Sequence, residues 1–155
     1  LAEVALKQLA ENLTDKVRSL NDFWSGSFTA WHVYADKEQA RREACQWMLL
    51  RGLFRPWVLS RFLSVEEVEL VMTNAQSFVD AFTNRTHVIK NIPDKLLDKL
   101  VKNLTLTGSL DDLDSLIAHL REYEAIGMQS VSLRIYTDPA SSIKLIGEHV
   151  IPALN

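Results

Sequence analysis

The chain has 155 residues, of which 47% are hydrophobic and 24% charged, and its formal net charge is −3. This composition is typical of one globular domain, and its acidic balance gives no global attraction to nucleic acid or to an anionic membrane. The one cysteine, Cys45, excludes an internal disulfide, and no apolar run approaches the roughly 18–20 residues of a membrane span. We therefore expect a cytoplasmic protein in which Cys45 is a small buried hydrophobe.

The first third of the chain predicts a helix, a strand and a second helix. Leucines and a valine recur every three or four residues over 1–21, which predicts an amphipathic helix. This helix starts at Leu1 without a cap, and we interpret that as the interior of a longer polypeptide. Residues 27–36 are aromatic and β-branched and predict a strand. Asp36 then caps a helix that we expect to end at Gly52.

The remainder predicts mainly helices. A Ser64-x-x-Glu67 capping box opens a helix to about Phe82, a polar connection follows over 83–91, and residues 94–101 form a short helix. A brief extended stretch at 104–108 leads to Ser109, which caps a helix that stops at Gly127. An apolar strand follows over 130–136, and Asp138 and Pro139 start a last helix that ends near Pro152.

The apolar strand near the C-terminus needs neighbours that this chain hardly provides. Strands that alternate with helices predict right-handed crossovers and a parallel sheet, and such sheets are covered on both faces. The sequence offers two good strands and one weak one, and so small a parallel sheet is marginal alone. We expect the sheet to be completed by another chain or by further residues of a larger α/β domain.

Residues 105–154 resemble the C-terminus of the bacterial luciferase-like flavin-dependent oxidoreductases. The likeness lies in a Gly-Ser turn before an amphipathic helix, a hydrophobic-Gly-hydrophobic break, an apolar strand and a closing helix, at Gly108-Ser109, Ile126-Gly127-Met128, Val131–Ile135 and Val150–Leu154. The stretch AWHVYADKEQARREACQWM is similar to the family's seventh strand and the helix after it. Leu110 and Asp111 depart from the Pro and Glu that often follow the family's turn.

The resemblance implies an α/β chain that is the C-terminal part of a (β/α)8 TIM barrel, mostly helical with two or three parallel strands. Residues 1–155 would be a single partial domain with a helical insertion at about 56–106. Family members use FMN or a deazaflavin coenzyme on small organic substrates. Most residues that hold the flavin belong to earlier strands. We therefore expect this chain to be inactive without the missing half, and one possibility is that it binds no cofactor by itself. We expect a homodimer or association with the missing barrel half, with no nucleic-acid or membrane partner.

Candidate catalytic residues lie at the carboxyl ends of the two good strands, where barrel enzymes keep their chemistry. They are His32, Arg134 and Tyr136, and no cofactor ligand can be assigned. Arg134 stands in an apolar strand, where a buried guanidinium is costly unless it is paired, so its partner could be a phosphate, a sulfonate or a carboxylate. Alternatively, its side chain leans outward to solvent. His32 could serve as a general acid or base, or could be satisfied by a backbone partner.

The polar connection of the insertion supplies a second group of candidates. In the family this region often forms a mobile lid, and Arg85, His87 and Lys90 could contact an anionic substrate there, unless the segment is a plain solvated loop. No histidine or cysteine spacing fits a metal site. The alternative hypothesis is a helical interaction module without cofactor, in which the apolar faces of residues 1–20 and 64–82 bind a partner chain.

Overall fold

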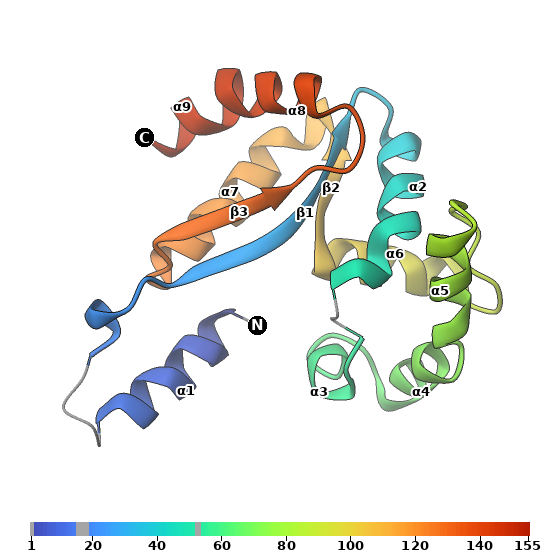
Figure 1. The fold of residues 1–155 in the computed structure, drawn as a ribbon, viewed down its shortest axis with the longest axis horizontal. Coiled ribbons are helices and arrows are strands. Elements are labelled where there is room, and N and C mark those ends of the chain that lie inside the picture. Colours follow the sequence, from blue (N-terminus) through green and yellow to red (C-terminus); the bar gives the residue numbers. More distant parts are fainter. Residues whose placement is uncertain (1, 15–18, 52–53) are drawn as a thin grey trace.

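The computed structural model describes residues 2–14, 19–51 and 54–155, which form an α/β fold with one parallel sheet (Figure 1). The expected end of the second helix at Gly52 lies outside these residues. The strands are β1 (Gly26–Tyr34), β2 (Thr105–Ser109) and β3 (Ser130–Arg134). The helices are α1 (Ala2–Thr14), α2 (Lys37–Trp47), α3 (Pro56–Leu59), α4 (Val65–Thr73), α5 (Ala75–Thr83), α6 (Asp94–Leu104), α7 (Leu113–Ala125), α8 (Pro139–Leu145) and α9 (Ile151–Leu154).

The sheet has the order β2-β1-β3, and both neighbours run parallel to β1. β3 pairs with the first half of β1, from Gly26 opposite Ser130 to Ala30 opposite Arg134. β2 pairs with the second half, from Ala30 opposite Thr105 to Tyr34 opposite Ser109. The weak extended stretch of the sequence is therefore a true strand. β1, the longest of the three, lies in the centre of the sheet.

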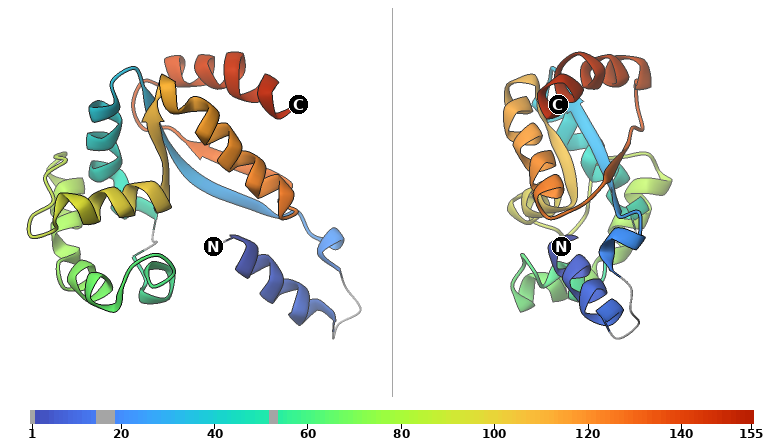
Figure 2. Two further views of the ribbon diagram at one scale, coloured as in Figure 1. Left: turned by 180° about the vertical axis from the view of Figure 1, so that it is seen from behind. Right: turned by 90° about the vertical axis from the view of Figure 1, so that its left-hand side faces the viewer.

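Helices cover both faces of this sheet. α2 packs on one face against β1 and β2. α7 and the C-terminal helix, which runs without a break from α8 through α9, lie on the opposite side (Figures 1 and 2). Right-handed crossovers that step from β1 to β2 and then back past β1 to β3 require this two-sided arrangement. A (β/α)8 barrel instead keeps consecutive strands adjacent and all its helices outside. The α/β class with a parallel sheet is thus as expected, while the order and coverage are those of an open, doubly wound sheet.

The hydrophobic core has two parts, one built on the sheet and one beside it. The smaller packs Trp31 and Val33 of β1 and Leu106 of β2 against α7 and the C-terminal helix. The larger lies among α2 and residues 54–104, a range that includes most of the expected helical insertion. Its fully buried members include Leu59, Val71 and Leu100. α2 links the two parts, because one of its faces contacts the sheet and another contributes Ala44, Cys45 and Met48 to the larger core.

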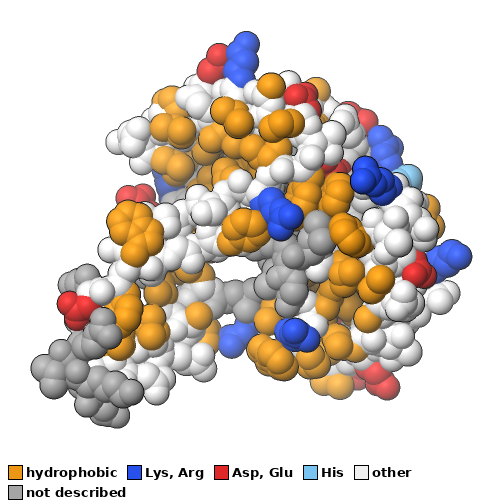
Figure 3. Space-filling model, viewed as in Figure 1, with side chains coloured by type: hydrophobic (Ala, Val, Ile, Leu, Met, Phe, Trp, Pro, Cys, Tyr) orange, Lys and Arg blue, Asp and Glu red, His pale blue; other side chains and the backbone are white. Residues whose placement is uncertain are grey.

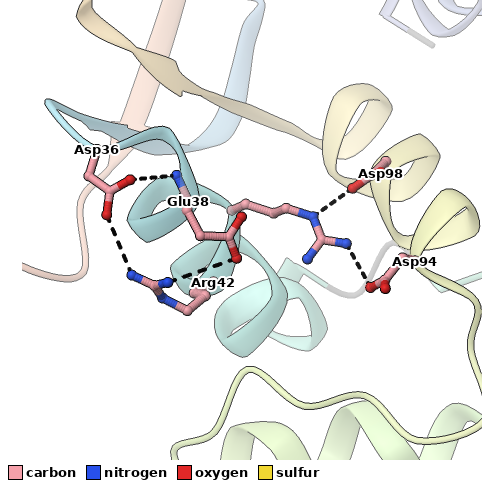
Figure 4. Close-up of polar contacts among 6 residues, drawn as sticks. Asp36, Glu38, Arg42, Asp94 and Asp98 are labelled. Atoms are coloured by element: carbon pink, nitrogen blue, oxygen red, sulfur yellow. Dashed lines mark hydrogen bonds and ion pairs between the residues drawn. The ribbon is translucent and has the colours of Figure 1, made fainter.

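Ion pairs fasten α2 to α6. Arg41 Nε lies 2.6 Å from Asp98 Oδ1, and its Nη2 lies 2.9 Å from Asp94 Oδ1 (Figure 4). On the outer side of the same helix, Arg42 reaches Asp36 and Glu38. Asp36 also caps α2 as expected, since its Oδ1 accepts a hydrogen bond from the Glu38 backbone N–H.

Two helix predictions were wrong in detail. The helix expected from Ser64 to about Phe82 is divided into α4 and α5 at Asn74, whose backbone leaves helical geometry and whose side-chain amide donates to the Leu70 carbonyl. Pro152 does not end the last helix but lies in the first turn of α9. A π-helical turn at Ile146–Val150 immediately precedes it. Proline has no backbone N–H, and a π-helical turn can accommodate the helical hydrogen bond that is therefore missing.

Across the described residues, no helix combines the length and apolar composition that a bilayer crossing requires.

Candidate functional site

The three catalytic candidates of the sequence come together on the α2 face of the sheet. His32 and Tyr34 alternate with the core residues Trp31 and Val33, so they point toward α2. Tyr136 follows β3, and its ring stacks on the His32 imidazole with centroids 5.5 Å apart and planes 7° apart. The Arg134 guanidinium carbon lies 4.9 Å from the Tyr136 ring centroid.

α2 supplies two further members that the sequence analysis missed. The Trp47 indole stacks on the Tyr136 ring with centroids 4.8 Å apart. Glu43 Oε2 lies 2.8 Å from His32 Nδ1 and also accepts a hydrogen bond from the Tyr34 hydroxyl. A signal was present, because Glu43 falls on the stripe of Ala40, Ala44 and Trp47 that an amphipathic α2 turns inward, and a carboxylate on an apolar stripe requires a partner.

The site buries one charged group among hydrogen-bond donors. Glu43 is 9% exposed and His32 is 0% exposed. Burial works to raise the pKa of Glu43, but its hydrogen bonds, that with His32 foremost, outweigh burial and hold this pKa below its ordinary value. Burial, followed by the hydrogen bond and negative charge of Glu43, raises the pKa of Tyr34 well above its ordinary value. Glu43 is therefore a carboxylate and Tyr34 a neutral phenol at neutral pH.

Arg134 leans outward, which is one of the alternatives that the sequence left open. Its side chain is exposed because β3 lies at the edge of the sheet, and it rests over the rings of Phe28 and Tyr136 instead of entering the core. Among the described residues it forms no ion pair with a carboxylate. A guanidinium on aromatic faces keeps its hydrogen-bonding edge available for an anion.

A cavity of about 390 Å³ lies at the carboxyl ends of the strands and shares Tyr34 with the site. Gln39, Asp138, Lys144 and neighbouring residues also line it. Asp138 has a left-handed backbone (φ 47°) and caps α8 by accepting a hydrogen bond from the Ser141 N–H, as the sequence predicted. In α/β sheets, ligands bind in the crevice outside the carboxyl ends of the strands where the strand order reverses. Here that reversal lies at β1.

The lid candidates stand apart from this cluster. Arg85, His87 and Lys90 are exposed in the connection between α5 and α6, and within the described residues their side chains form no ion pair with any carboxylate. Arg85 has a left-handed backbone (φ 52°), which marks a tight turn after α5. None of the three contacts His32, Arg134 or Tyr136 through a hydrogen bond or a ring in the described structure.

Two other features bear on the chemistry that is open to the site. The described residues hold no group of three or more histidine, cysteine, aspartate or glutamate side chains placed to bind a metal ion. Cys45 is buried, as expected, and burial raises the pKa of its thiol to about 11. The arrangement can therefore bind a planar or anionic group and accept a proton, but it offers no thiolate nucleophile.

Comparison with family models, with curated proteins and with solved structures found no match to this chain.

Proposed function

We propose that the chain is the C-terminal part of a luciferase-like flavin-dependent monooxygenase or oxidoreductase that uses reduced FMN or a deazaflavin on a small organic substrate. One observation carries the proposal. The residues that the resemblance and the strand positions single out, His32, Tyr136 and Arg134, form one cluster next to the carboxyl ends of parallel strands. Catalytic groups of α/β enzymes concentrate at this end of the strands.

The cluster fits part of what a flavin and its substrate need. The stacked Trp47 and Tyr136 rings offer an aromatic surface, and the exposed Arg134 offers a cation for a phosphate or sulfonate. When bound, the flavin supplies the redox chemistry, and the protein contributes binding, orientation and electrostatics. His32 with Glu43 would hold or accept a proton beside it, and Arg134 would bind the anionic group.

The barrel part of the proposal requires a different strand order and further residues. In a barrel with β1 as the seventh strand and β3 as the eighth, these two strands would still pair, and the sixth strand would occupy the edge of β1 that β2 now holds. The open sheet would then be the arrangement of the 155-residue chain alone. Such a protein would need about 180–200 further residues upstream, since six strand–helix units of roughly 30 residues or more each would precede β1. We propose that without them the chain is inactive.

The experiment compares the 155-residue chain with the longer polypeptide that the proposal requires. We expect the longer protein to change the absorbance of FMN or of the deazaflavin on titration, and we expect a weak change or none from the short chain. Arg134→Gln should weaken binding of the anionic ligand by about 10- to 100-fold, because a charge-assisted hydrogen bond contributes about 1.5–3 kcal/mol. Arg55→Gln, another exposed arginine, is the matched control. No spectral change with the longer protein would refute the flavin proposal.

The alternative interaction module is less well supported. Val71 and Phe78 of α4 and α5 are buried within the chain itself, as are Leu6 and Leu13 of α1. Leu9 of α1 is 39% exposed, and Figure 3 shows apolar side chains on the surface of this helix, so only the face of α4 and α5 is largely covered. Self-association as a dimer and a cytoplasmic location stay part of the flavoenzyme proposal, as does the anion-binding role of Arg85, His87 and Lys90.

A further inference from the structure

The buried histidine of the site has one nitrogen that is paired and one that is not. His32 Nδ1 lies 2.8 Å from Glu43 Oε2, whereas His32 Nε2 has no hydrogen-bond partner among the described residues, although it is fully buried. A buried polar atom without a partner costs about 1–3 kcal/mol, so such atoms concentrate where function or a bound molecule requires them.

The hydrogen bonds around Glu43 decide which nitrogen carries the proton. An ionised carboxylate can only accept, so the hydrogen in the short His32–Glu43 contact belongs to Nδ1. The Tyr34 hydroxyl donates to the same oxygen, Oε2, which holds the carboxylate in place from a second side. In a neutral imidazole whose Nδ1 is protonated, Nε2 bears the lone pair.

We propose that Glu43 is a positioning residue that holds His32 as the Nδ1-protonated tautomer and thereby makes Nε2 a proton acceptor for a hydroxyl or N–H group of a bound ligand. This inference rests on the same site as the proposed function. In the transfer, the ligand's O–H or N–H bond breaks, its electron pair stays on the ligand atom, and the proton bonds to Nε2. The resulting imidazolium is balanced by the Glu43 carboxylate, and no oxidant or reductant is needed.

Access to Nε2 requires a neighbour to move, because the His32 side chain is fully buried. The Tyr136 ring stacks directly on the imidazole, is itself half-buried, and belongs to the connection between β3 and α8. Loop side chains of this kind move more readily than residues within the sheet. We assign to Tyr136 the role of covering the imidazole.

Nitrogen NMR of the uniformly ¹⁵N-labelled 155-residue chain tests the tautomer directly, without flavin or substrate. Two-bond ¹H–¹⁵N correlations distinguish a protonated ring nitrogen from one with a lone pair, and His32→Gln identifies the His32 signals among the four histidines. At a pH at which the imidazoles are neutral, we expect a single His32 tautomer with the proton on Nδ1. A proton on Nε2, a mixture of tautomers, or a doubly protonated ring would each overturn the proposal.

Two variants separate the role of Glu43 from general packing. Glu43→Gln keeps the shape but replaces the carboxylate by an amide that can also donate to Nδ1, so we expect His32 to lose its single tautomer. Tyr34→Phe removes the other donor to the same oxygen and leaves the His32 contact, so the tautomer should persist. An unchanged tautomer in Glu43→Gln would overturn the positioning role. If that variant fails to fold, the wild-type and Tyr34→Phe spectra still decide the tautomer, and neither result depends on flavin binding.

Discussion

At the scale of single residues, the environment of each side chain depends on whether its strand is central or at an edge. His32 and Arg134 both stand in apolar strands, and the sequence left burial and exposure open for Arg134. His32 is in the central β1 and is fully buried, whereas Arg134 is in the edge strand β3 and is exposed over two aromatic rings. Composition predicts that a segment is a strand, but it does not predict how many neighbours the strand has.

Cys45 gives the first prediction. Burial raises the pKa of its thiol to about 11, and the side chain is 2% exposed. At pH 8 only about one molecule in a thousand then carries the reactive thiolate. We expect negligible reaction with a disulfide reagent such as Ellman's reagent in the native protein, and stoichiometric reaction of this one thiol in concentrated urea. Rapid labelling of the native chain would show that α2 opens away from the larger core.

At the scale of elements, the helix starts were the most predictable features of this chain. Ser64 with Glu67, and Asp138 with Pro139, cap α4 and α8 as expected, and Gly127, with φ 88°, ends the turn after α7. These signals are local, so a few side chains near one backbone turn are sufficient to set them. The break at Asn74 and the position of Pro152 were missed because packing and an added π-helical turn override local preference there.

The junction between β2 and α7 depends on Asp112. Its Oδ2 accepts hydrogen bonds from the Ser109 N–H and hydroxyl, and its Oδ1 lies 2.9 Å from Lys37 Nζ of α2. Gly108 allows this close approach, because a Cβ there would lie 2.8 Å from Asp112 Cβ. The Ser109 backbone bond foremost, with Lys37 and the Ser109 hydroxyl, lowers the pKa of Asp112 to about 2.

A pH dependence follows from this pKa. Because the pKa is lower in the folded than in the unfolded state, Asp112 stabilises the fold above about pH 4, and that contribution is lost as the pH falls from about 4 to about 2. We expect Asp112→Asn to lower the urea midpoint at pH 7 and to lose less further stability than the wild type between pH 4 and pH 2. Asp114→Asn, which removes a carboxylate from the first turn of α7, should resemble the wild type. Parallel pH profiles of the wild type and Asp112→Asn would contradict the assignment.

At the scale of the whole molecule, the parallel sheet was predictable and its order was not. Two strands, their apolar character and the helices between them follow from composition and periodicity. Which edge of β1 receives β3 depends on contacts far apart in the sequence, and the sequence gives no local signal for them. In the candidate site, too, only the local features were predictable. His32, Tyr136 and Arg134 could be chosen from their strand positions. Glu43 and Trp47 join them only because α2 folds back over that face of the sheet.

The pairing of β1 with β3 can be tested by a disulfide. Phe28 and Ser132 are opposite each other in the register, and neighbouring strands lie about 4.8 Å apart, which is within the span of a disulfide. In a Cys45→Ala background, Phe28→Cys with Ser132→Cys should therefore crosslink on mild oxidation of the 155-residue chain. Phe28→Cys with Ser130→Cys, displaced by two residues or roughly 8 Å, should not. Mass spectrometry after digestion without reductant measures both yields.

A second pair of cysteines distinguishes an open sheet from a barrel in the longer polypeptide. Ala30 and Thr105 are opposite each other in the register of β1 and β2, so Ala30→Cys with Thr105→Cys, again in the Cys45→Ala background, should crosslink in the 155-residue chain. If the sixth strand of a barrel occupies this edge of β1, that crosslink should disappear while the one between positions 28 and 132 persists. If it forms equally well, the order β2-β1-β3 belongs to the complete protein, and the barrel half of the proposal is wrong. Flavin binding is measured separately. If the sheet is open and the protein still binds flavin, we expect the cofactor at the carboxyl edge beside His32 and Tyr136, where the strand order reverses.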